Sequence, residues 1–296
     1  MNATQLATAT TVTAEIALAL HPILIKQIPV GLPTQLLARL GTYSVLAGAA
    51  ASPSDVAASW GSWPAAWKSI GFGLMNLVHI GSSYVSYTHL PAGSALALFY
   101  TYPFFNILAG VLFLGESFDV AILPLLLAAF VGVLFIAKYT KDGDEDKEGG
   151  AKDGSKKNIA LGVVASLISA LTETMIFMIT KTGEEPTAWL PILKLYPGAL
   201  AGLLAWGVWS GAKFQTTFDN WKPLLLFNIF IGFLGYSLRF WSIPRLPTAV
   251  FSILTFIGVA AGYGWGLMYA KEVPSKGALF GAGLITGSLA LLRGKN

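Results

Sequence analysis

The sequence contains no cysteine and only three histidines, and charged residues make up just 11% of its 296 residues. The absence of cysteine excludes disulfides, thiolate metal ligands and cysteine nucleophiles. A soluble domain carries about 25% charged residues, so this chain has too little charge to cover a water-exposed surface. The net charge of +4 is also too small for a nucleic-acid-binding surface. Soluble enzymes, secreted modules and nucleic-acid-binding proteins are therefore excluded.

Long apolar stretches take the place of the missing charge. Hydrophobic residues make up 54% of the chain, and the mean hydropathy is +0.64. A bilayer core about 30 Å thick needs roughly 20 residues per helix, and the sequence offers ten such stretches. They lie at about 7–27, 33–51, 69–89, 91–114, 119–138, 159–181, 188–210, 222–243, 247–269 and 276–293. The sequence predicts an all-α, polytopic membrane protein in a lipid bilayer, with the choice between plasma and organellar membrane left open.

A charged segment divides the chain. Twelve charged residues of both signs lie between positions 138 and 157, in a glycine-rich stretch that cannot bury apolar surface. We expect a first five-helix repeat over 1–138, a charged linker over 139–157 and a second five-helix repeat over 158–296.

The two parts of the chain resemble each other at an offset of 154 to 156 residues. The matching residues are Lys26 with Lys181, Arg39 with Lys194, Trp67-Lys68 with Trp221-Lys222, Leu90-Pro91 with Leu246-Pro247, and Glu116 with Glu272. Because each repeat has five spans, an odd number, the second must enter the membrane from the opposite side. Inverted repeats place a site near the bilayer midplane that opens alternately to each side, which predicts transport.

Four short motifs resemble the drug/metabolite transporter superfamily (EamA-like, related to triose-phosphate and nucleotide-sugar translocators). They are Ile25-Lys26, Leu37-Ala38-Arg39, Tyr102-Pro103-Phe104-Phe105 and Phe113-Leu114-Gly115-Glu116. The resemblance covers nearly the whole chain in helix number and spacing. It implies a fold of five plus five helices, with a cavity lined mainly by spans one, three, four, six, eight and nine.

The resemblance also bears on the substrate. His79 in the third span resembles the histidine of plastidic phosphate translocators. Those proteins also carry a lysine before the fourth-span motif and a Lys-Arg pair in the ninth span. Here Phe99 and Thr255-Phe256 stand at these places. The phosphate-binding cations are absent, so the sequence does not favour a sugar-phosphate substrate.

Three charged residues lie at membrane depth in the predicted spans, where ionisable groups normally face the bundle interior or a wet cavity. Glu15 and Glu173 can each bind a cationic group or carry a proton, or can neutralise a basic residue of the bundle. Arg239 can bind a substrate carboxylate or phosphate, or pair with a protein carboxylate such as Glu173. Both alternatives stay open for each residue.

Further polar residues complete the predicted substrate-binding set. Added to the three charged residues, they give Glu15, Asn76, His79, Tyr100, Glu173, Tyr236, Arg239 and Thr255. Arg39 and Lys194 occupy matched positions, which favours an architectural role such as pairing with Glu15 or Glu173, or reaching helix-end carbonyls.

Several other residues are predicted to serve the helices themselves. Lys26 and Lys181 lie near span ends and are expected to extend to the membrane interface. Glu116 and Glu272 are expected to cap the helices that they precede. The glycine pairs 277/281 and 283/287 predict close packing of the last span, within the bundle or across a dimer.

These features predict a secondary active transporter of a small organic metabolite, driven by protons or by exchange. The favoured substrate is zwitterionic or anionic, such as an amino acid or organic acid, and the alternative is a cationic or aromatic drug-like solute. A polytopic membrane enzyme is the alternative of another class, but no catalytic motif or nucleotide-binding motif is present. We therefore expect no enzyme activity, no catalytic residues, no metal and no cofactor, in a monomer or homodimer.

Overall fold

The computed structural model describes residues 2–21, 30–89, 95, 98–139, 159–183, 187–215, 217–269 and 275–293. Within these ranges the regular structure is helical throughout. The predicted linker therefore lies almost entirely outside the described residues, as do Lys26, Leu90-Pro91 and Glu272. The all-α prediction is confirmed for the described part of the chain.

The described chain folds into two compact units. Unit 1 comprises 1–81 and 175–246, and unit 2 comprises 82–174 and 247–296. Each unit thus contains segments from both predicted repeats. The boundaries at 81/82 and 174/175 fall inside continuous helices, α5 (Trp63–His89) and α9 (Ile159–Thr182).

Unit 1 contains the first helices of the chain and those that follow α9. Besides its parts of α5 and α9, it holds α1 (Ala3–Leu18), α3 (Leu32–Ala50), α4 (Pro53–Trp60), α10 (Leu190–Ser210), α11 (Phe218–Phe227), the π-helix η2 (Asn228–Phe233), α12 (Leu234–Ser242) and the 3-10 helix η3 (Ile243–Arg245). In this unit α1 packs against α12, and α3 packs against α10.

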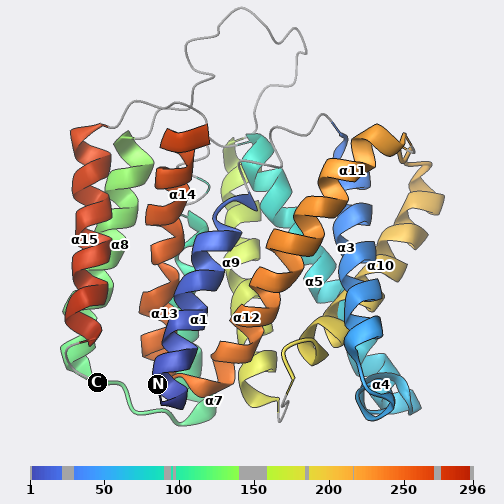
Figure 1. Ribbon diagram of the computed structural model, residues 1–296, viewed down its shortest axis with the longest axis horizontal. Coiled ribbons are helices and arrows are strands. Elements are labelled where there is room, and N and C mark those ends of the chain that lie inside the picture. The colour runs from blue at the N-terminus through green and yellow to red at the C-terminus, as the bar shows by residue number, and fades with distance from the viewer. Residues whose placement is uncertain are drawn as a thin grey trace, which may run out of the picture. The chain divides into compact units, whose positions relative to one another are not determined.

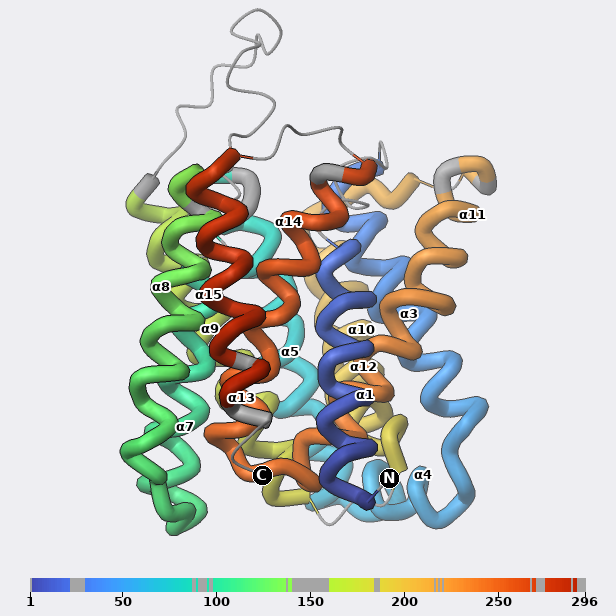
Figure 2. Tube along the Cα trace, turned by 60° about the vertical axis from the view of Figure 1, so that its left-hand side comes forward, coloured from blue at the N-terminus to red at the C-terminus, as the bar shows by residue number. Residues whose placement is uncertain are grey.

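Unit 2 contains the remaining helices. Besides its parts of α5 and α9, it holds α7 (Tyr102–Leu114), the 3-10 helix η1 (Val120–Ile122), α8 (Leu123–Tyr139), α13 (Thr248–Thr255), α14 (Ile257–Tyr269) and α15 (Lys276–Arg293). Helices α8 and α15 lie side by side along their lengths (Figures 1 and 2).

Glycines explain the close approach of α8 and α15. A Cβ atom at Gly281 would lie 2.5 Å from the carbonyl oxygen of Gly132, and one at Gly277 would collide with the ring of Tyr139. Gly283 and Gly287 face open space instead. The predicted close packing by small residues is therefore confirmed for one of the two glycine pairs, as a contact within the chain.

The helices largely follow the apolar stretches. Four of the described helices are long and apolar enough to cross a membrane, namely Ala160–Thr182, Leu190–Ser210, Trp221–Arg245 and Thr248–Gly266. Two shorter apolar helices span Tyr102–Leu114 and Val120–Ile136. The first helix begins at Ala3 rather than at position 7, and the eight-residue α4 was not expected. Asn2 explains the early start because it forms a capping box with Gln5.

Candidate functional site

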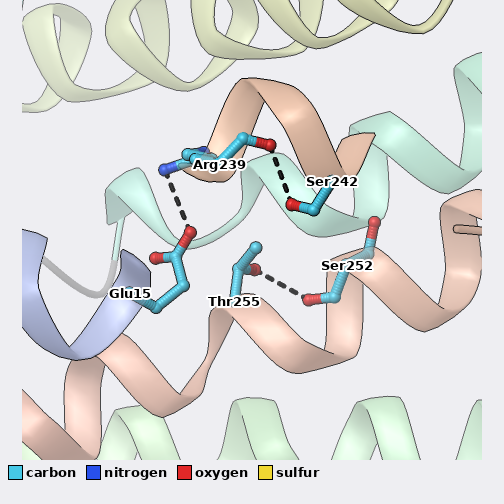
Figure 3. Close-up of polar contacts among 5 residues, drawn as sticks. All are labelled: Glu15, Arg239, Ser242, Ser252 and Thr255. Carbon is cyan, nitrogen blue, oxygen red and sulfur yellow. Dashed lines mark hydrogen bonds and ion pairs between the residues drawn. The ribbon is translucent and has the colours of Figure 1, made fainter. Parts of the chain in front are cut away.

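A buried ion pair joins α1 to α12 in unit 1. The Nη1 atom of Arg239 lies 3.3 Å from Oε1 of Glu15, and the two side chains are 7% and 3% exposed (Figure 3). A charge removed from water is strongly unfavourable unless an opposite charge compensates it. The pair therefore neutralises two groups that neither helix could bury alone.

Close packing of the two helices sets this distance. A Cβ atom at Gly235 would lie 2.9 Å from Cδ2 of Leu18, so a larger residue here would displace the Leu18 side chain. Residues three or four apart share one helix face. Glu15 is three residues before Leu18, and Arg239 is four residues after Gly235, so the two charged side chains extend from the contacting faces.

Side chains of α12 and α9 donate hydrogen bonds to carbonyls at the end of α12 and just beyond it. The hydroxyl of Ser242 donates to the Arg239 carbonyl at 2.8 Å (Figure 3). Beyond it, the ammonium of Lys181 donates to the carbonyls of Ile243, at 3.4 Å, and Leu246. Lys181 thus satisfies carbonyls that the residues before Pro247 leave without a helical donor. Its position at the membrane interface stays a prediction.

A second cationic group in unit 1 is surrounded by aromatic rings. Arg39 on α3 approaches His21 Nε2 at 3.4 Å and Tyr196 Oη at 3.5 Å. Its guanidinium carbon lies 5.7 Å from the ring centre of Tyr43 and 5.0 Å from that of Tyr236. We call these five residues the Arg39 cluster. Rings at these distances stabilise a guanidinium by cation–π attraction.

Tyr236 connects the Arg39 cluster to the ion pair. It lies three residues before Arg239 on α12, so its ring contacts Arg39 from the turn of helix that precedes the ion pair. The π-helix η2 lies just before this turn, and a Cβ atom at Gly232 would collide with the hydroxyl of Tyr43. Two buried arginines are therefore held along one short stretch of helix.

The other two predicted site residues of unit 1 lie on α5. Asn76 is buried and donates from Nδ2 to the carbonyl of Leu195 at 3.3 Å, so it joins α5 to α10. His79, one turn further along, is also buried. Gly73 permits this approach, because its Cβ would lie 2.5 Å from the backbone of Gly198.

The remaining three predicted site residues belong to unit 2. Tyr100 packs against the rings of Phe99, Tyr102 and Phe256. The hydroxyl of Thr255 donates to the Ser252 carbonyl at 2.8 Å (Figure 3). Glu173 is buried in α9. The structure thus divides the predicted set between the units.

Sequence reasoning missed some contacts of these residues. The sequence predicted a protein carboxylate as one possible partner of Arg239, with Glu173 as the example, and the structure shows that Glu15 is such a partner. The tyrosines at 43 and 196 were not singled out, although Tyr43 follows Arg39 by four residues and so shares its helix face. Glu116 does cap a helix, but that helix is α13, whose Thr248 amide donates to Glu116 Oε2 at 3.0 Å.

The described residues form no metal site built from acidic or histidine side chains. No group of three or more His, Asp or Glu side chains among them is arranged to hold a metal ion. The prediction that the protein uses no cofactor stays a prediction.

The distribution of polar and apolar side chains defines the class of protein. Large apolar residues such as Val208, Trp209 and Phe113 are 88%, 86% and 76% exposed, whereas Glu15 and Arg239 are buried. This arrangement is the reverse of a soluble surface and suits a lipid environment. The chain is an integral, multi-pass membrane protein.

Comparisons with known proteins support a drug/metabolite transporter-type superfamily. Two curated relatives are both named Pseudopaline exporter CntI. The one from Pseudomonas aeruginosa (strain UCBPP-PA14) is 26% identical over 225 residues, which cover 75% of this chain and 74% of that protein. The one from the PAO1 strain is 25% identical with the same coverage. A scan against family models finds no match.

A solved crystal structure supports the fold. It matches this chain with a TM-score of 0.72 at 15% identity, covering 98% of this chain and 99% of the other. At that identity the likeness shows the fold alone.

Proposed function

We propose that this protein is a secondary active transporter that moves a small zwitterionic or anionic metabolite by alternating access. The observation that carries the proposal is the buried Glu15–Arg239 pair in a multi-pass membrane protein whose relatives are named as exporters. The proposal includes a ten-helix fold of two inverted repeats, 1–138 and 158–296, joined by the 139–157 linker.

The ion pair suggests how binding and coupling are linked. A substrate carboxylate can accept two hydrogen bonds from the Arg239 guanidinium and so replace Glu15 as its partner. The released Glu15 carboxylate then needs a new partner at low dielectric, and a proton or a substrate ammonium group serves equally. Glu173 is the second candidate for binding an amine. Substrate exchange and proton coupling both follow from this competition for Arg239.

Counterflow in proteoliposomes tests the transport function. Vesicles preloaded with an unlabelled amino acid or organic acid should take up the labelled solute transiently, and uptake should saturate. Arg239→Ala should abolish this counterflow. Arg245→Ala is the matched control, because that arginine contacts the Trp241 carbonyl and ring on the same stretch of chain and should leave counterflow intact. Non-saturating flux without counterflow would contradict the proposal.

A second variant separates coupling from binding. Glu15→Gln removes the charge that competes with substrate, and the glutamine amide cannot take up a proton. We expect counterflow to persist while accumulation driven by a pH gradient is lost. A cationic or aromatic substrate would give the opposite pattern, in which Glu173→Gln abolishes transport and Arg239→Ala does not.

A further inference from the structure

A small hydroxyl-lined pocket lies within unit 2, where α5 packs against α9. The space among its lining residues is about 160 Å³, and this figure includes solvent at the open mouth of the pocket. The lining comprises Ser83, Ser86, Ala95, Phe99, Ser166 and Ser169. No charged side chain belongs to this lining, so any charge that it binds must be compensated by neutral oxygen atoms.

The four serines form two pairs across the helices. The hydroxyls of Ser83 and Ser169 are 2.6 Å apart, and those of Ser86 and Ser166 are also in hydrogen-bond contact. Within each helix the two serines are three residues apart, and the pairs run in opposite directions along α5 and α9. The hydroxyls of neighbouring turns therefore gather at one place.

The hydroxyl protons of Ser86 and Ser166 are both engaged in hydrogen bonds. Ser166 donates to the carbonyl of Ala95 at 3.3 Å, so Ser86 must be the donor in its bond with Ser166. Each serine hydroxyl has one proton and two lone pairs. Ser86 and Ser166 therefore have only acceptor capacity left. The pocket is rich in acceptors and suits a ligand that is a cation or a strong donor.

We propose that this serine pocket binds a compact monovalent cation through its hydroxyl oxygens and the Ala95 carbonyl. Hydroxyl and carbonyl oxygens are the ligands of hard cations, and carbonyls can replace an ion's hydration shell. Neutral oxygen sites hold coupling ions in transporters. Two sources share this chemistry, an inorganic ion such as Na⁺ and the primary ammonium group of a solute. Only the assignment of the cation to transport rests on the proposed function; its binding does not.

Thermal unfolding of the purified full-length protein tests the pocket without requiring transport. NaCl and methylammonium chloride are titrated separately against choline chloride at constant ionic strength. A cation that binds only the folded state raises the apparent Tm in a saturable way. We expect such a rise with at least one of the two salts. A rise with Na⁺ identifies an inorganic ion, and a rise with methylammonium identifies the ammonium group of a solute.

Variants of the lining serines test whether the rise in apparent Tm comes from cation binding in this pocket. Ser86→Ala combined with Ser166→Ala should weaken the apparent cation affinity at least tenfold. Ser44→Ala is the control, since that hydroxyl donates to the Leu40 carbonyl of its own helix and lies in unit 1. Ser86→Thr keeps the hydroxyl and should retain the response if the double variant fails to fold. The absence of a saturable shift with either salt, or an equal shift in the double alanine variant, would overturn the proposal.

Discussion

Arg239 and Glu15 lie 224 positions apart in the sequence but form one ion pair, with 3.3 Å between Nη1 and Oε1. The pair ties the first helix of the chain to α12, near the end of unit 1's sequence. Because both side chains are buried, each depends on the other for neutralisation. The pair therefore holds α1 and α12 together, and under the proposed function it is also where a charged substrate competes.

Removing one member of the pair should destabilise the protein strongly. We expect Arg239→Met or Glu15→Gln to lower the free energy of unfolding by about 3–5 kcal/mol, because each leaves a buried group without its partner. The double variant should lose less than the sum of the two. A double-mutant cycle from denaturant unfolding in micelles measures this coupling, and purely additive losses would show that the two residues do not interact.

Replacing Lys181 should loosen the turn that follows α12. Lys181→Met removes the donor to the carbonyls of Ile243 and Leu246, and hydrogen bonds to charged groups contribute about 1.5–3 kcal/mol. We expect a loss of this size in the same unfolding assay. Lys213→Met, at an exposed position, is the control and should change little. Equal stability of both variants would show that these two hydrogen bonds contribute little.

The glycines of α15 should differ sharply in their tolerance of a side chain. Gly281→Ala places a methyl group 2.5 Å from the Gly132 carbonyl, so α8 and α15 must move apart. We expect a loss of about 1–3 kcal/mol from this overpacking. Gly283→Ala, two positions away and facing open space, should be neutral or slightly stabilising. The apparent Tm of the two variants measures this difference. Similar values would argue against the close contact of α8 with α15.

Acid should weaken the cap of α4. The Ser52 backbone amide and hydroxyl hold the pKa of Asp55 below its ordinary value of 3.8. A lowered pKa means that the carboxylate stabilises the cap fully above pH 3.8 and that this contribution is lost as the pH falls through the lowered value. Carboxyl-carbon NMR of labelled aspartate follows the titration. Ser52→Ala should raise the midpoint, and an unchanged midpoint would contradict the cap.

Hydropathy predicted most of the helices because membrane length and apolar composition are properties of a continuous stretch. The range 276–293 matches α15, and 188–210 nearly matches α10. Helix α4 was missed because its eight residues carry too little periodic signal. That Arg239 needs a partner follows from its place in an apolar helix.

The identity of that partner does not follow from the sequence. It depends on which helix face approaches α12, and in the structure this is the face of α1 that carries Leu18, next to Gly235. The hydrogen-bond partners of Lys181 and Glu116 could not be predicted from the sequence either. Each serves a backbone group far away in sequence, at Leu246 or Thr248, and tertiary packing alone sets that distance.

The proposed transport cycle requires that the second half of the chain cross the membrane in the opposite direction to the first. The chain contains no cysteine, so Lys68→Cys and Lys222→Cys each introduce a single reactive thiol at an exposed position. A membrane-impermeant maleimide is applied to vesicles of known orientation. The account predicts that the two positions react from opposite sides of the membrane. Reaction of both from the same side would contradict the inverted repeat and the alternating-access transport inferred from it.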